Sequence, residues 1–186
     1  MQVSNLVSEM ISDQQILEGC LKHDKHSQKL LFEKYSGMLM GICVRYATDI
    51  PEAEDILQES LVKIYINIKD YSGEGSFLGW MRRIVINTAI TYYHKNLKHK
   101  HYIEIEELYT SEGSDSSYIG SRYTADELQK VLDLLPPGYK VVFCLYAIEG
   151  YKHKEIAEML DIDVNTSKSQ YSRARSFLRK KLENYK

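Results

Sequence analysis

The sequence lacks the features that mark several common functional classes. No apolar run approaches the roughly 20 residues that a membrane-spanning helix needs, and the polar N-terminus has no signal-peptide core. No nucleophile–base pair and no glycine-rich phosphate motif is recognisable. We therefore expect a cytoplasmic protein that is not inserted in a membrane, is not an enzyme, and uses no cofactor and no small-molecule substrate.

Cysteine is scarce, and its placement argues against disulfides. Cys20, Cys43 and Cys144 are odd in number, widely separated and surrounded by apolar helical sequence, which is typical of buried free thiols in a reducing compartment. A metal-dependent enzyme that uses the histidines is an alternative. They have no partnered cysteine or carboxylate at ligand spacing, so we expect no metal site. The histidines in question are His94, His99 and His101.

A strong net charge is also absent, since the formal charge is only −2. The charges are nevertheless separated along the chain. Residues 81–100 and the segment from Lys168 to the end are basic, whereas residues 103–127 between them are acidic. This pattern predicts two basic surfaces separated by an acidic strip, each able to contact phosphates once it is positioned.

Strand alternation and internal repeats are missing, while helical periodicity runs through most of the chain. The predicted fold class is all-α, with two small helical domains at 1–100 and 125–186. Residues 101–124, rich in Ser, Gly and Asp, are expected to form a flexible acidic linker. The expected helices are one beginning near Ser12, then 27–47, 51–69 and 77–98, one beginning near Ala125 and broken at 136–138, and 139–149.

Residues 152–181 predict two short amphipathic helices joined by a tight turn, a helix-turn-helix pattern. Asp161 occupies the turn, where glycine is usual, and Asp163 is placed to cap the second helix. The first helix turns Ile156, Ala157 and Leu160 inward, and the second turns inward Val164, Ser167, Tyr171, Ala174 and Leu178. Its opposite face carries Thr166, Ser169, Arg173, Ser176 and Lys180, with Asn165 and Ser172 at the edge.

Hydroxyls, an amide and arginines on one helix face suit a DNA major groove, because they reach phosphates and base edges. An ordinary helical hairpin with a solvated basic face is the alternative. A DNA-binding regulator, with this pair of helices and an N-terminal sensor or dimerisation domain, is a second functional reading.

Two earlier segments also carry functional patterns. Residues 52–68 predict a helix with an apolar stripe opposite an acidic face, which is either a solvated surface or a docking surface for a basic partner. Residues 71–95 place aromatic side chains, Trp80 among them, between basic ones after a glycine-bearing loop, and such a mixture suits single-stranded nucleic acid. A place in the core is the alternative for Phe77 and Trp80.

Taken in order, the three segments resemble the extracytoplasmic-function (ECF) sigma factors of bacterial RNA polymerase. The matching motifs are EAEDILQESLVKIY, YSGEGSFLGWMRRIVINTAITYY and LPPGYKVVFCLYAIEGYKHKEIAEMLDIDVNTSKSQYSRAR. The resemblance implies a sigma factor that binds core polymerase and directs promoter-specific, DNA-templated transcription initiation. It makes 1–100 the domain for core binding and for minus-ten recognition and melting, and 125–186 the domain for minus-thirty-five recognition.

The resemblance also assigns roles to individual positions. The acidic face would bind the coiled coil of the polymerase beta-prime subunit, through Glu54, Asp55, Gln58 and Glu59. The loop and fourth helix would hold the minus-ten element, through Tyr71, Ser72, Gly73, Glu74, Ser76, Phe77, Trp80, Arg83, Asn87, Thr91 and Tyr92. The last helix would read the minus-thirty-five element, through Asn165, Thr166, Lys168, Ser169, Gln170, Ser172 and Arg173.

The partners that the resemblance implies are core RNA polymerase, through its beta-prime coiled coil and beta flap, promoter DNA and an anti-sigma factor. Four positions depart from the family pattern. Besides Asp161 and Asp163, Gln170 stands where arginine is frequent and Thr91 where aspartate is common. These departures bear on the promoter sequence that is read.

Overall fold

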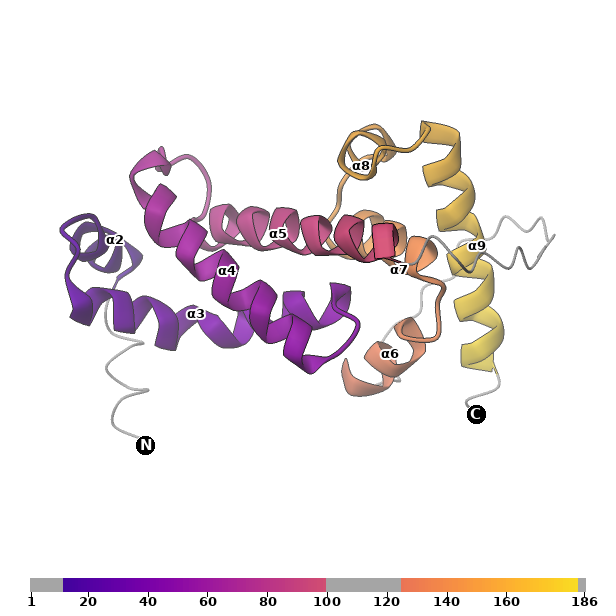
Figure 1. Ribbon diagram of the computed structural model, residues 1–186, viewed down its shortest axis with the longest axis horizontal. Coiled ribbons are helices and arrows are strands. Elements are labelled where there is room, and N and C mark those ends of the chain that lie inside the picture. Colours follow the sequence, from indigo (N-terminus) through magenta and orange to yellow (C-terminus); the bar gives the residue numbers. More distant parts are fainter. Residues whose placement is uncertain (1–11, 100–124, 184–186) are drawn as a thin grey trace. The chain divides into compact units, whose positions relative to one another are not determined.

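The computed structural model describes residues 12–99 and 125–183, and all regular secondary structure in those residues is helical. The chain divides into two compact units, Met1–Leu97 and Lys98–Lys186. Each unit has a helical core of its own (Figure 1). The prediction of an all-α chain with two helical domains is therefore confirmed, while the predicted linker lies outside the described residues.

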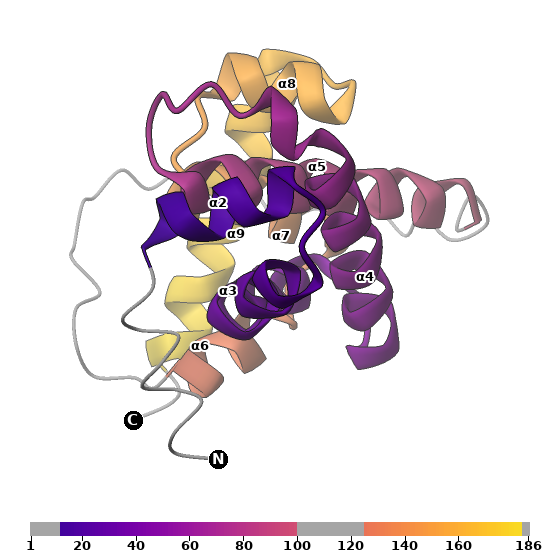
Figure 2. The same cartoon turned by 90° about the vertical axis from the view of Figure 1, so that its left-hand side faces the viewer.

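The N-terminal unit contains four α-helices and one short 3-10 helix in its described part. They are α2 (Asp13–Leu21), α3 (Lys25–Tyr46), α4 (Ile50–Asn67), η1 (Ile68–Asp70) and α5 (Phe77–His99). Helix α2 packs crosswise on α3 and also contacts η1, and α3 packs on α4 (Figure 2). The expected helices thus form, with boundaries displaced by one to two residues.

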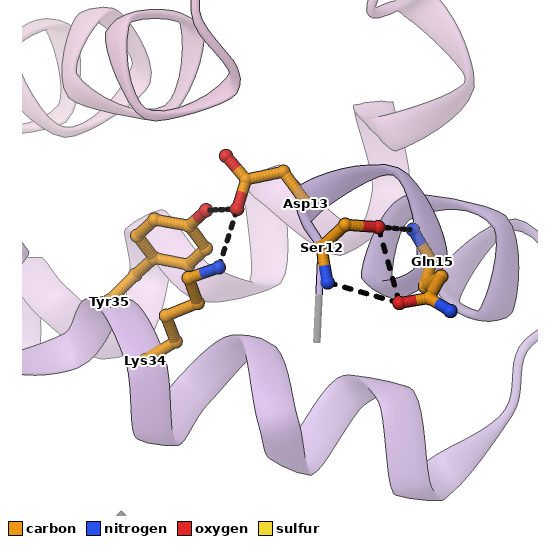
Figure 3. A network of polar contacts seen from close by, with 5 residues as sticks. All are labelled: Ser12, Asp13, Gln15, Lys34 and Tyr35. Carbon is orange, nitrogen blue, oxygen red and sulfur yellow. Dashed lines mark hydrogen bonds and ion pairs between the residues drawn. The ribbon is translucent and has the colours of Figure 1, made fainter. Parts of the chain in front are cut away.

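Polar side chains fix where these helices begin. The Ser12 hydroxyl accepts a hydrogen bond from the backbone N–H of Gln15, and the Gln15 side chain accepts from the backbone N–H of Ser12 (Figure 3). This capping box confirms the predicted start of the first helix. The side chains of Asp24 and Asp49 cap α3 and α4 by accepting from the backbone N–H groups of Ser27 and Glu52. Pro51 is tolerated because the first turn needs no N–H.

The core of the N-terminal unit comes from stripes of aliphatic residues, as the helical periodicity predicts. On α4 the fully buried positions Ala53, Ile56 and Ile64 face the rest of the unit. Cys20 and Cys43 are buried free thiols, as expected. Burial raises the pKa of Cys20 to about 11 and that of Cys43 to about 12, so both stay protonated near neutral pH.

Two glycines in the middle of α3 suggest a test of the fold. Gly37 and Gly41 are exposed, and a Cβ atom at either position would meet nothing within 4 Å. Because glycine is about 0.8–1 kcal/mol less favourable than alanine inside a helix, Gly37→Ala and Gly41→Ala should each raise the free energy of unfolding by up to that amount. Denaturant unfolding followed by circular dichroism measures the change.

Gly19 provides the opposite control for this test. A Cβ atom there would lie 1.9 Å from the Ser27 hydroxyl oxygen, at the close contact between α2 and α3. Gly19→Ala should therefore destabilise the unit. A Gly19→Ala variant that is as stable as the unaltered protein would contradict the close packing of α2 on α3.

The C-terminal unit is built around its last helix. Its elements are α6 (Ala125–Leu132), α7 (Pro137–Phe143), the π-helix η2 (Cys144–Ile148), α8 (His153–Leu160) and α9 (Val164–Glu183). Helix α9 contacts α6, α7 and α8. Ala174 and Leu178 of α9 pack with three buried residues from the end of α6 and the turn after it, namely Val131, Leu132 and Leu135.

The segment before the helix-turn-helix differs from its prediction. A single helix is expected over 139–149, but α7 begins at Pro137 and widens at Cys144 into the π-helix. The wider turn buries Cys144 and Leu145 side by side and leaves the next residue, Tyr146, exposed. Gly150 ends this segment with a φ of +81°, as the sequence predicts.

Candidate nucleic-acid interface

Helices α8 and α9 form the predicted helix-turn-helix. Ile156, Ala157 and Leu160 of α8 are buried as expected. Asp161 adopts a left-handed backbone, with φ 53° and ψ 49°, and its own N–H bonds the Ala157 carbonyl. A non-glycine residue thus supplies the turn that glycine usually makes, which aspartate tolerates better than most residues.

The two helices are tied together at their N-terminal ends. The Asp163 carboxylate accepts a hydrogen bond of 2.7 Å from the Asn165 N–H, which confirms its predicted capping role. Ser167 is fully buried and lies 2.9 Å from His153 Nδ1 of α8. The His153 ring stacks on Tyr146, and burial, with a smaller contribution from the Lys168 charge, lowers its pKa.

Most of the polar residues that the helical period and the family resemblance assign to α9 are exposed, but Ser176, which was expected on the outward face, is half-buried. Asn165, Lys168, Ser169, Ser172 and Arg173 are exposed, whereas Thr166 and Gln170 are half-buried. The seven side chains therefore share one helix, and five of them are exposed to a ligand.

Residues of α7 that the sequence did not single out lie beside this face. The Tyr139 hydroxyl is 3.3 Å from Arg173 Nη1, which donates to it. A Cβ atom on Gly138 would come within 3.3 Å of the Gln170 amide nitrogen. The N-terminal turn of α7 thus holds Arg173 and limits the space of Gln170. Only the LPPGYK motif pointed to this turn, and it gave no indication of which side chains it would contact.

The acidic face of α4 is exposed for most of its length. Glu54, Asp55 and Gln58 are exposed, but Glu59 is half-buried. Oε1 of Glu59 forms an ion pair with Nζ of Lys63, at a distance of 2.7 Å. That hydrogen bond, more than any other contact, lowers the pKa of Glu59. Glu59 therefore offers less uncompensated charge to a partner than Glu54 or Asp55.

Two aliphatic residues extend the same face of α4 and were not predicted as site residues. Val62 and Ile66 follow Glu54 and Gln58 at four-residue intervals, and 56% and 64% of their surfaces are exposed. The exposed stripe is thus acidic in its first half and apolar in its second. The helical period already places both residues on this face, but the sequence analysis considered only its acidic residues as candidates.

The loop between η1 and α5 has a defined conformation. Gly73 and Gly75 have φ values of +81° and +76°, which glycine adopts without strain. The Tyr71 hydroxyl donates a 2.8 Å hydrogen bond to the Gly75 carbonyl, across the loop. The Ser76 hydroxyl accepts from the Gly79 N–H and so caps α5. Ser72, Gly73, Glu74 and Ser76 are all exposed.

An aromatic cluster lies directly beneath this loop. Phe77 is 4% exposed and packs against Tyr71, Trp80 and Tyr35, with ring centroids 5.2, 5.9 and 6.0 Å away. Trp80 is half-buried and stacks nearly parallel to Phe77. Phe77, which the family resemblance places along the minus-ten strand, is therefore a core residue in this structure, as its alternative reading has it.

The remaining minus-ten candidates lie along α5. Arg83, Asn87 and Thr91 are exposed at four-residue intervals and so form one stripe. The Thr91 hydroxyl donates to the Asn87 carbonyl, which leaves its oxygen free to accept. Tyr92 is half-buried and turned toward α4: burial, then a hydrogen bond to Glu59, raises its pKa. The structure thus groups three of these residues and separates Tyr92 from them.

Within residues 12–99 and 125–183 no three His, Cys, Asp or Glu side chains lie close enough together to hold a metal ion. His101 of the histidine alternative lies outside that part of the chain. None of the helices in the described ranges is both long and apolar enough to cross a membrane.

Comparison with known proteins connects these surfaces to one family. Residues 31–98 match the family model for sigma-70 region 2, and residues 125–178 match that for sigma-70 region 4. The ECF RNA polymerase sigma-E factor of Haemophilus influenzae is 28% identical, over 95% of this chain and 98% of its own length. The RNA polymerase sigma-H factor of Pseudomonas aeruginosa is also 28% identical, over 92% and 94%.

Two solved structures share the fold. The sigma factor RpoE of Bartonella quintana, in complex with the anti-sigma factor NepR, has a TM-score of 0.53, with 17% identity over 83% of this chain and 96% of that one. CnrH, in complex with the cytosolic domain of CnrY, has a TM-score of 0.50, with 18% identity over 92% and 97%. Since the two matched regions and the full-length relatives agree, the chain belongs to the ECF sigma factors of RNA polymerase and contains sigma-70 regions 2 and 4.

Proposed function

We propose that this sigma factor, which directs promoter-specific transcription initiation by RNA polymerase, divides promoter recognition between its two units. The C-terminal unit reads the minus-thirty-five element and the N-terminal unit captures the minus-ten element. Neither unit supplies a catalytic centre; the chemistry belongs to the polymerase. The observation that carries the proposal is the exposed polar face of α9 on the second helix of a helix-turn-helix.

In this proposal the α9 face enters the major groove at minus thirty-five. Arg173 and Ser169 lie one helical turn apart on its exposed side, so both reach base edges from one groove position. Arginine forks onto guanine, and the hydroxyls and Lys168 bind phosphates. Asn165, Thr166, Gln170 and Ser172 complete the contact face.

The minus-ten element is proposed to bind along the loop at 71–76 and the exposed stripe of α5. Gly73 has no side chain to obstruct a base, and the exposed loop allows an extruded base to approach the backbone. Arg83, Asn87 and Thr91 then follow the melted strand. Phe77 is left out of the contacting set because its ring is buried, and Trp80 presents only part of its ring.

Core polymerase is proposed to dock on the exposed stripe of α4, with the beta-prime coiled coil as its basic partner. Glu54 and Asp55 supply uncompensated charge that steers a basic surface, and Gln58 adds hydrogen bonds. The beta flap is proposed to hold the C-terminal unit. An anti-sigma factor is a further proposed partner, because the Bartonella quintana structure is a complex with one. All of these encounters take place in the cytoplasm.

The experiment that tests the proposal is reconstitution with core RNA polymerase. Transcription of fragmented genomic DNA of the source organism, followed by start-site mapping, should give sites that require the protein and share two sequence elements. A plain helix-turn-helix regulator would bind DNA without polymerase and would not depend on Glu54 or Asp55. Start sites that do not change when the protein is omitted would refute the proposal.

A further inference from the structure

We infer that Tyr71 is a positioning residue for promoter opening, because it holds the base-capturing loop in its binding conformation before DNA arrives. The inference rests on the proposed minus-ten role of the loop at 71–76. The observation behind it is a hydrogen bond across the loop, the clasp, in which the Tyr71 hydroxyl donates to the Gly75 carbonyl at 2.8 Å.

The clasp spans the part of the loop whose backbone is intrinsically the most flexible. Gly73 and Gly75 lose more backbone freedom on ordering than other residues do, and both have positive φ values. Between them, the Glu74 N–H bonds only the Ser72 hydroxyl, at 3.3 Å. The Tyr71–Gly75 hydrogen bond therefore joins the two ends of a segment that would otherwise sample many conformations.

The ring of Tyr71 is itself fixed by the buried cluster. It packs 5.2 Å from Phe77 and 5.7 Å from Trp80, and Phe77 in turn meets Tyr35 edge-on. Such contacts between rings add to simple burial. Because the rings of Phe77 and Trp80 hold it, the hydroxyl of Tyr71 points at the loop from a fixed position.

The aromatic cluster is anchored to helix α2. The Asp13 carboxylate of α2 accepts hydrogen bonds from the Tyr35 hydroxyl and, at 2.7 Å, from Lys34 (Figure 3). Burial raises the pKa of the Tyr35 hydroxyl, and its hydrogen bond to Asp13 raises it further. The hydroxyl therefore stays protonated near neutral pH and can donate to Asp13. The polar contact and the ring stack together form a continuous support from α2 to the loop.

A preformed loop lowers the cost of capturing a base. A flexible loop would have to be ordered at the same moment as the DNA is unstacked, and that ordering reduces affinity. With the clasp in place, only the unstacking remains, so Tyr71 acts on the melting step and not on polymerase binding. It need not touch the DNA to do so.

The test uses holoenzyme reconstituted from core polymerase and Tyr71→Phe, which removes the hydroxyl and keeps the ring. The probe is a fluorescent single-stranded DNA with the non-template minus-ten sequence of a mapped promoter. We expect its Kd to rise about fivefold, the effect of one hydrogen bond. The rate of promoter opening on duplex DNA should fall similarly, and a template already mismatched at minus ten should not restore it, because the cost of ordering the loop remains.

Tyr65→Phe is the matched control in the same unit. The Tyr65 hydroxyl also donates to a backbone carbonyl, that of Gln28 at 2.9 Å, but it is not part of the cluster below the loop. We expect this variant to bind the single-stranded probe like the unaltered protein. Core-polymerase affinity should be unchanged in both variants. Unchanged probe affinity of Tyr71→Phe, or an equal loss in Tyr65→Phe, would overturn the inference.

A loop variant separates failure of this inference from failure of the proposed function. Ser72→Ala/Glu74→Ala changes the exposed loop side chains and keeps both glycines. If it weakens probe binding while Tyr71→Phe does not, the loop binds DNA and the clasp is irrelevant. If neither variant affects binding, the loop is not the minus-ten site and the proposed function itself fails at this point.

Discussion

Arg173→Ala is expected to weaken use of the minus-thirty-five element by roughly 1–3 kcal/mol, which is a loss of about 5- to 150-fold. The guanidinium is exposed on α9 and is held in place by the Tyr139 hydroxyl. It therefore meets a base without first giving up a buried contact, and arginine on guanine gives bidentate recognition. The measurement is the Kd of holoenzyme for promoters that differ only at minus thirty-five.

Arg175→Ala is the charge-matched control for this experiment. Arg175 is two residues further along the same helix, so it points about 160° away from Arg173, and its guanidinium lies 5.9 Å from the Tyr171 ring centre. Both variants lose one positive charge, so a general loss of phosphate attraction would affect them alike. Equal losses on all minus-thirty-five sequences would show that Arg173 contributes charge and no sequence information.

Glu54→Lys/Asp55→Lys is expected to lower the affinity for core polymerase by roughly a hundredfold or more, because like charges that are brought together across an interface cost several kcal/mol. Both carboxylates are exposed on α4. Glu59, by contrast, is already paired with Lys63. The double substitution therefore reverses the two carboxylate charges that a basic partner can reach. Fluorescence titration of labelled protein with core polymerase gives the Kd.

The control variant has the same change in net charge, but at other positions of the N-terminal unit. Glu18→Lys/Glu33→Lys introduces the same four-unit change on α2 and α3, at carboxylates whose only recorded polar contacts are surface ones. Core affinity should remain within about twofold for this variant, since surface pairs contribute little. Equal loss in both variants would mean that overall charge, and not the α4 face, governs docking.

Much of the fold follows from local sequence rules. Ser12 and Asp163 are capping residues recognisable from their position before apolar-periodic segments, and each caps in the structure. The buried positions of α8 also agree with a simple helical period, as do the exposed positions Ser169, Arg173 and Lys180 of α9, whereas Thr166 and Ser176 are half-buried. These features depend on contacts within a few residues, so a single sequence contains them.

The features that sequence reasoning missed depend on contacts between distant segments. The π-helix at Cys144–Ile148 changes the register of the helix expected over 139–149, which a constant period of 100° per residue does not predict. For Phe77 the sequence left two interpretations open, and the core interpretation holds because Tyr35, 42 positions earlier in the chain, packs on its ring. The proximity of Tyr139 to Arg173 has the same origin, a helix packing on another helix. No local pattern encodes such pairs.

The position of Trp80 has a practical consequence. It is the only tryptophan of the chain, and its half-buried indole lies 5.7 Å from the Tyr71 ring at the edge of the loop. Fluorescence excited selectively in the indole band therefore originates from one known place. A base that enters the loop changes the surroundings of that indole, by excluding water or by quenching its emission. The protein thus carries its own optical probe of DNA capture, and stopped-flow mixing can follow the event without any label.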